Sequence, residues 1–152
     1  MSEHNEFYPV ITNSKNIYFT SDKPTAKGKD DIFLSEWKGQ RYLEAVSLSE
    51  AVNSEGYEYN AYVAPDESYL IFAGFDRDQN LGRSDLYISF NSDSNWSSPI
   101  WLGKEINSEG YDGSPFVSRD GKYLIFTSSR GSNDDDTYFN HYILAFDPSR
   151  FK

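Results

Sequence analysis

The sequence predicts an all-β fold made of three β-propeller blades, each a four-stranded antiparallel unit. The first observation is a repeat: Asn-Ser-Glu-Gly-Tyr at residues 53–57 returns at residues 107–111, an offset of 107 − 53 = 54. Residues 66–72 return as residues 120–126 at the same offset. The second observation is that the chain has 12 Tyr and 11 Phe, and aromatic residues favour strands. A period near fifty residues is typical of arrays of small units that bury their apolar faces against one another.

The repeats divide the 152 residues into a single domain of three blades, at about residues 2–53, 54–107 and 108–152. In the second blade, we expect strands over residues 59–64, 69–73, 85–90 and 96–102. The second of these strands is apolar on both faces, which implies cover on both sides. A blade between two neighbouring blades provides that cover, whereas a β-sandwich leaves one face of each sheet in water.

The first and third blades follow the same order. In the first, we expect strands over residues 7–12, 16–21, 31–36 and 41–48, followed by one helical turn over residues 49–52. In the third, we expect strands over residues 114–118, 123–128 and 142–146. No fourth strand is predicted after these three, so the last blade is expected to be incomplete.

Residues 117–130, Val-Ser-Arg-Asp-Gly-Lys-Tyr-Leu-Ile-Phe-Thr-Ser-Ser-Arg, resemble the WD-like β-propeller repeat of TolB-type proteins. Residues 84–88 resemble the third strand of that repeat, and residues 96–108 resemble the linking outer strand of a bacterial branch of the family. The resemblance covers nearly the whole chain. It implies an interaction platform, in some cases a domain of a peptidase, in the periplasm or cell envelope, although the chain begins without a recognisable signal peptide.

Propellers of the TolB type usually close with six or more blades, and three blades cannot close a ring. Two explanations remain open for a chain with three units. It is the C-terminal half of a longer six-bladed protein, or two copies assemble as a homodimer that completes one six-bladed ring.

The composition of the chain excludes several classes of binding partner. The net charge is −10 and Lys and Arg form no cluster, so the sequence predicts no nucleic-acid partner and no affinity for anionic membranes. No apolar run approaches the roughly 18 residues of a membrane-spanning helix, so we expect no membrane insertion. The chain has no Cys, which excludes disulfides, Cys-ligated zinc and thiol nucleophiles.

Acidic residues predict a binding surface. In a four-stranded blade, the loops after the second and fourth strands leave on the same side. The loops after the second strands are rich in Asp, so they share a face with the linkers that follow the fourth strands. The candidate binding residues are Glu55, Glu58, Glu109, Asp112, Asp134, Asp135 and Asp136. We expect this negative face to recruit a protein or peptide with basic character, while the alternative is that these charges serve only solubility.

Calcium is the one cofactor that the sequence suggests. The loop from residue 76 spaces oxygen ligands as D-x-D-x-N with a later Asp, and calcium takes six to eight oxygens. The candidate ligands are Asp76, Asp78, Asn80 and Asp85. Leu81 and Leu86 stand where an EF-hand requires Gly and Glu. The alternative is a polar inter-strand loop whose Asp side chains cap backbone amides.

No catalytic constellation is visible, and the sequence predicts a protein that is not an enzyme. There is no G-x-S-x-G motif, and only His4 and His141 are available as histidine bases. Residues 89–96 have the spacing of the S-x-D-x-G-x-x-W box of sialidase-like propellers, with Asn91 and Asp93 in place of its Asp and Gly.

The leading prediction is therefore a non-enzymatic module that binds a protein or peptide. A propeller fragment or subunit of a hydrolase, either a peptidase or a glycosidase, is the first alternative. An envelope propeller that binds carbohydrate is the second, and it would use exposed aromatic residues such as Trp37, Trp96 and Trp101. The alternative for these tryptophans is packing between neighbouring blades.

Overall fold

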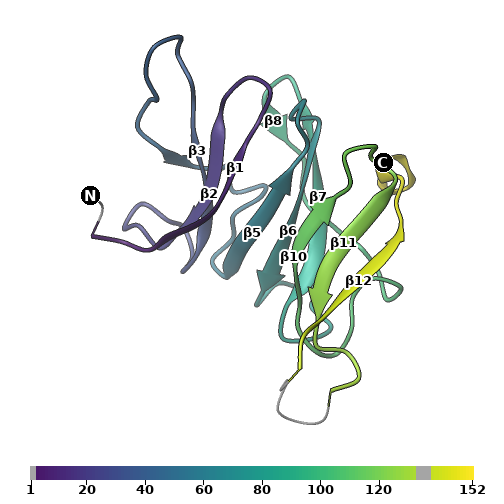
Figure 1. Ribbon diagram of the computed structural model, residues 1–152. Coiled ribbons are helices and arrows are strands. Elements are labelled where there is room, and N and C mark those ends of the chain that lie inside the picture. The colour runs from purple at the N-terminus through teal and green to yellow at the C-terminus, as the bar shows by residue number, and fades with distance from the viewer. Residues whose placement is uncertain (1–2, 133–137) are drawn as a thin grey trace.

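The computed structural model describes residues 3–132 and 138–152, and the protein is all-β, with three antiparallel sheets side by side (Figure 1). Sheet I contains β1 (Glu6–Ile11), β2 (Ile17–Ser21), β3 (Asp31–Ser35) and β4 (Val46–Ser47). Sheet II contains β5 (Tyr57–Val63), β6 (Tyr69–Phe75), β7 (Asp85–Ser92), β8 (Asn95–Trp96) and β9 (Ile100–Trp101). Sheet III contains β10 (Asp112–Val117), β11 (Tyr123–Ser128) and β12 (Asn140–Ala145).

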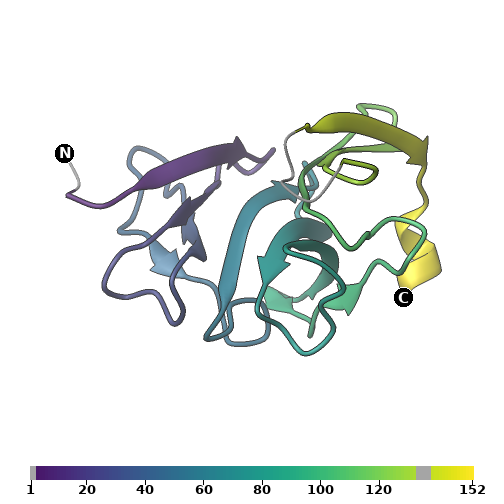
Figure 2. The same ribbon diagram turned by 90° about the horizontal axis from the view of Figure 1, so that it is seen from below.

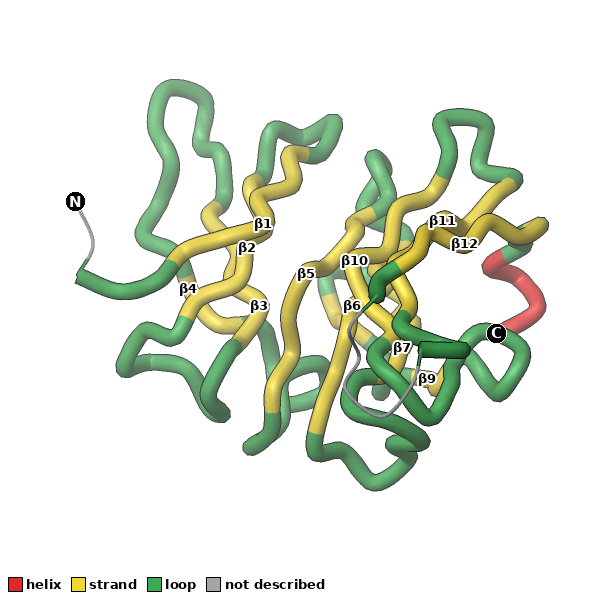
Figure 3. Tube along the Cα trace, turned by 60° about the horizontal axis from the view of Figure 1, so that its bottom comes forward, coloured by secondary structure: helices red, strands yellow, loops and turns green. Residues whose placement is uncertain are grey.

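Within each sheet, strands that follow one another in the chain lie side by side, except that β9 pairs with β7 and not with β8. Seen from below, sheet II lies between sheet I and sheet III (Figure 2). Loops join the strands, and the helix that the described residues contain is a short 3₁₀ turn, Pro148–Phe151, after sheet III (Figure 3).

The strand predictions are confirmed for the first three strands of every unit, and the fourth strands differ. Residues 41–48 are reduced to the two residues of β4, because the chain from residue 36 to residue 43 folds back on itself and bridges Trp37 to Tyr42. The predicted strand over residues 96–102 is split into β8 and β9, since Pro99 between them has no N–H to donate. The turn predicted over residues 49–52 is present, with the Asn53 amide donating to the Ser49 carbonyl at 3.0 Å.

The hydrophobic core lies in two layers between the sheets. Side chains that join sheets I and II are Tyr18, Ile32, Leu48, Val52, Ala61, Val63, Leu70, Phe72 and Tyr87. Side chains that join sheets II and III are Ile71, Ala73, Leu86, Ile88, Leu102, Ile106, Val117, Leu124, Phe126 and Phe146. Strand β6 supplies alternate residues to both layers, and its residues 70–73 are fully buried. The sequence-based expectation that this strand is covered on both faces is confirmed.

The first strand of every sheet carries a β-bulge. Its register shifts beside Tyr8, Asn60 and Ser114, which all have positive φ, at 54°, 52° and 49°. Tyr8 donates from its hydroxyl to the Pro115 carbonyl at 3.2 Å, and Asn60 donates from Nδ2 to Ser114 Oγ at 3.2 Å. These contacts link β1 to β10 and β5 to β10, so the first strands of all three sheets meet.

Candidate functional site

Two linkers with the same sequence connect the sheets: the first, residues 53–57, joins sheet I to sheet II, and the second, residues 107–111, joins sheet II to sheet III. Each linker begins with a buried asparagine. Asn53 accepts the Ile32 amide at 3.0 Å and donates to the Ile32 carbonyl at 2.9 Å. Asn107 makes the same pair of bonds to Leu86, at 2.7 and 3.0 Å. Each asparagine thus satisfies both backbone groups of a residue in the third strand of the preceding sheet. These hydrogen bonds hold each linker beside the joint between two sheets, where joint means the packed interface between neighbouring sheets.

Glu58 lies just behind the first linker and is buried. The Ser54 amide donates to its Oε2 at 2.8 Å, and the guanidinium of Arg77 donates to its Oε1. Arg77 also donates to the Val52 carbonyl at 2.9 Å, so it reaches back to the unit before. Burial raises the pKa of Glu58, while the bonds from Ser54 and Arg77 oppose the rise by favouring the carboxylate.

The second joint repeats this arrangement around Asp112. The Ser108 amide donates to its Oδ2 at 2.6 Å, and Arg130 Nη2 lies 3.0 Å from its Oδ1. Arg130 also donates to the Ile106 carbonyl. The side chains of Glu58 and Asp112 are 0% exposed. Their placement on an exposed binding surface needs correction, because each carboxylate is neutralised by an arginine inside a joint between sheets.

The arginines were missed by sequence reasoning, although a signal for them exists. Lys23, Arg77 and Arg130 recur at offsets of 54 and 53, each two residues after the end of the second strand of its unit. Arg77 lies over the rings of Phe72 and Tyr87, 5.5 and 5.3 Å from their centroids. A cation over stacked aromatic rings is stabilised by the ring quadrupoles as well as by its carboxylate partner.

A groove of about 700 Å³ opens at the joint between sheets I and II. Its walls are the linker over residues 50–56, the loop over residues 76–79, and the side chains of Tyr87 and residues 98–99. Four exposed acidic residues line it: Glu50, Glu55, Asp76 and Asp78. Arg77, which also lines the groove, is paired with Glu58. The predicted binding residue Glu55 therefore shares one groove with two of the predicted metal ligands.

The remaining predicted binding residues lie elsewhere. Glu109 is exposed on the second linker, and it does not line the groove. Asp134, Asp135 and Asp136 lie outside the described residues. The structure thus gathers Glu55 with Asp76 and Asp78, and it separates them from Glu109.

Asp85, the last of the predicted calcium ligands, is buried and engaged by its own loop. Its carboxylate accepts the amides of Leu81 and Gly82 at 2.7 and 3.2 Å, and the indole N–H of Trp101 at 2.6 Å. Asn80 donates to the Gly82 carbonyl. Among the described residues, no group of three or more His, Asp or Glu side chains is placed to hold a metal ion.

The corresponding residue of sheet I supports a structural role for Asp85. Asp31 accepts the amides of Lys27 and Gly28 at 2.8 and 3.2 Å, together with the Ser47 hydroxyl at 2.6 Å. Both aspartates therefore cap the loop that precedes a third strand, which is the alternative that the sequence left open for the loop from residue 76.

Trp96 and Trp101 pack against the core between sheets I and II, the alternative left open for the tryptophans, while Trp37 and His141 make contacts within their own sheets. Trp37 packs on Tyr42 with ring centroids 4.8 Å apart, and Trp96 meets Tyr18 edge to face at 6.2 Å. His141 is exposed on β12, with its Nδ1 3.3 Å from the Thr127 hydroxyl.

Over the ranges 3–132 and 138–152, no helix has the length and apolar character needed to cross a bilayer. Neither the protein-family models nor the curated proteins compared with this chain contain a match to it.

Proposed function

We propose that the protein is a three-bladed propeller-type scaffold that binds a basic segment of a partner protein in the groove between sheets I and II. The observation that carries this proposal is the convergence of Glu50, Glu55, Asp76 and Asp78 on one groove. A groove of about 700 Å³ has the size range of ligand-binding clefts. Two segments from different units build it, so the joint itself creates the site.

The propeller arrangement is supported by the repetition of one plan in three sheets. Each sheet begins with a bulged strand that contacts its neighbours at the common centre, and each joint uses the same asparagine, carboxylate and arginine. Residues 70–73 of β6, in sheet II, are buried on both faces of the sheet. Sheets that stand side by side and pack face against face are the arrangement expected of propeller blades.

Electrostatics favours a basic ligand. The groove presents four exposed carboxylates, while the guanidinium of Arg77 is held by Glu58 and contributes little free positive charge. The whole chain carries a net charge of −10, so its long-range field also attracts cations. The ring of Pro99, which lines the groove, offers apolar contact for the stems of Lys or Arg side chains.

The experiment is a fluorescence-anisotropy titration with a labelled ten-residue peptide of alternating Lys and Ser. We expect saturable binding that weakens by about tenfold or more between 50 and 300 mM salt, since a groove of this charge acts through screened interactions. A peptide in which Glu replaces every Lys is expected not to bind. Binding of both peptides with equal affinity would contradict the proposal.

A pair of variants assigns the binding to the groove. The variant with Glu55→Lys and Asp78→Lys reverses two charges in the groove, and we expect its affinity to fall by about tenfold or more. The matched control carries Glu44→Lys and Glu105→Lys, two exposed residues outside the groove, and changes the net charge by the same amount. Equal losses in the two variants would mean that the peptide senses only total charge, and the groove would be excluded as its site.

A further inference from the structure

The two joints inside the chain show what the faces of these sheets require. On the side of sheet II that meets sheet I, Val63 and Leu70 are 2% and 0% exposed. On the side that meets sheet III, Ile71 and Ile88 are both 0% exposed. An aliphatic residue at these positions is therefore covered wherever a neighbouring sheet is present.

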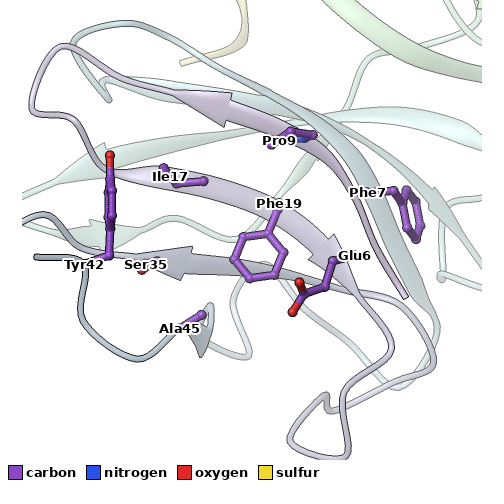
Figure 4. Close-up of a pocket in the computed structure, with 8 residues that line it drawn as sticks. All are labelled: Glu6, Phe7, Pro9, Ile17, Phe19, Ser35, Tyr42 and Ala45. Atoms are coloured by element: carbon purple, nitrogen blue, oxygen red, sulfur yellow. The ribbon is translucent and has the colours of Figure 1, made fainter. Parts of the chain in front are cut away.

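Sheet I presents the first kind of face, and within residues 3–132 and 138–152 no sheet packs on it. The positions of Val63 and Leu70 are taken by Ile11 and Ile17, which pair across β1 and β2 as Val63 and Leu70 pair across β5 and β6. Ile11 is 63% exposed. Ile17 and Phe19 line a groove of about 450 Å³ on this face. Figure 4 shows Phe19 at its middle, with Phe7 to one side and Tyr42 to the other.

Sheet I also carries the cation of the joints in an open form. Lys23 Nζ lies 2.7 Å from Glu6 and 5.2 and 5.8 Å from the ring centroids of Phe19 and Phe33. The exposed fractions of the Lys23 and Glu6 side chains are 25% and 39%. For Arg77 and Glu58, inside a joint, they are 14% and 0%. The same assembly of charge and stacked rings is thus present, but uncovered.

Sheet III presents the second kind of face. Ile125 and Ile143 pair across β11 and β12 as Ile71 and Ile88 pair across β6 and β7. Ile143 is 65% exposed, and Tyr123 on β11 is 45% exposed. Apolar side chains of this size gathered on one sheet face are typical of a surface that another protein covers.

We infer that sheet I of one copy packs on sheet III of a second copy, head to tail, so that two chains close one ring of six sheets. Each chain carries both halves of the joint that it uses internally, the face of Ile11 and Ile17 and the face of Ile125 and Ile143. A two-fold arrangement covers both faces of both copies at once, and a ring of six sheets falls within the range of closed propellers. The inference rests on the propeller arrangement proposed above, and it is independent of the acidic groove.

The test is the native mass of the full chain, measured by light scattering after size exclusion and by native mass spectrometry. We expect twice the 17.5 kDa of a single chain at about 20 μM. Substitutions Ile11→Asp and Ile143→Asp, each on an exposed side chain, are expected to weaken the dimer by about tenfold or more. The control Val46→Asp changes a residue that is 58% exposed on the face of sheet I turned toward sheet II, and it is expected to leave the dimer intact.

Mixing the two variants gives the sharpest outcome. In a mixed pair, one interface contains both substitutions and the other contains neither, so the head-to-tail arrangement predicts that the equimolar mixture pairs through the unaltered interface, which neither variant alone contains. No dimer in that mixture, a single-chain mass for the unsubstituted protein at 100 μM, or open polymers that lengthen with concentration would each overturn the inference. The peptide titration on monomeric Ile143→Asp separates the two proposals, since loss of the dimer leaves the groove unchanged.

Discussion

Arg77 and Glu58 form an ion pair that is 14% and 0% exposed, at the point where the linker from sheet I enters sheet II. The same guanidinium donates to the Val52 carbonyl, so one side chain joins the two units. Its counterpart Arg130 does the same for Asp112 and Ile106. Stability of the joints between sheets therefore depends on a few buried polar contacts as well as on apolar packing.

Removing the Arg77 guanidinium is expected to destabilise the folded protein. In Arg77→Leu, Glu58 stays buried without its cation, and we expect the free energy of unfolding to fall by about 3 kcal/mol. The double variant Arg77→Leu with Glu58→Gln is expected to regain part of this loss, because the buried charge is then absent. Urea denaturation followed by tryptophan fluorescence measures both. The control Glu36→Gln, in an ion pair that is 58% and 43% exposed, is expected to change stability by less than about 1 kcal/mol.

The linker asparagines are expected to behave alike. Asn53→Ala leaves the amide and carbonyl of the fully buried Ile32 without their side-chain partner, and Asn107→Ala does the same to Leu86. The Ile32 and Leu86 carbonyls still accept the amides of Leu48 and Leu102, so the unsatisfied group is the backbone amide, and we expect a loss of about 1–3 kcal/mol for each variant in thermal and urea unfolding. Asn13→Ala, at an exposed position, is expected to remain within about 0.5 kcal/mol of the parent protein. A loss below that limit for Asn53→Ala would show that the linker relaxes around the gap.

Gly82 lies where the backbone of the next linker passes closely. A Cβ on it would meet the Gly110 carbonyl oxygen and would stand 2.5 Å from the Ser108 carbonyl oxygen. Both obstacles are backbone atoms, so Gly82→Ala is expected to lower the melting temperature by about 10 °C or to prevent folding. The control Gly121→Ala meets nothing within 4 Å and bears only the strain of φ at +72°, for which about 1 kcal/mol is expected. Equal effects in the two variants would exclude the steric explanation.

The hydrogen bonds around Glu67 predict that its contribution to the stability of the protein is lost at acidic pH. Burial raises the pKa of its carboxyl, but hydrogen bonds from Ser14, Thr12, Tyr18 and Asn16 outweigh that effect and hold the pKa below its usual 4.5. Because the folded-state pKa is lowered, the carboxylate stabilises the protein above about pH 4.5, and this contribution is lost as the pH falls through the folded-state value.

The measurement is the unfolding free energy of Glu67→Gln and of the parent protein from pH 7 to pH 3. We expect the parent to be more stable at pH 7 and the difference to shrink steadily below about pH 4.5. Glu55→Gln, on an exposed side chain in the groove, serves as the control and is expected to show a small difference that does not vary in this way. A difference for Glu67→Gln that stays constant down to pH 3 would contradict the assignment.

The all-β class, the three repeated units and most strand positions follow from the amino-acid sequence alone. Local signals suffice for these features: the Asn-Ser-Glu-Gly-Tyr repeat sets the period, and the continuous apolar run of β6 reports burial on both faces. The short β4 and the split at Pro99 were not predicted, because outer strands have few partners and depend on where the chain crosses the sheet edge.

Which acidic residues are available for binding depends on how the three sheets pack together. Glu55 and Glu58 are three residues apart and equally acidic in sequence, yet one lines an open groove and the other is buried with Arg77. That difference depends on a cation 19 residues further along the chain, at a joint between two sheets. A charge is neutralised or exposed according to what lies beside it in space, and no local pattern records that neighbour.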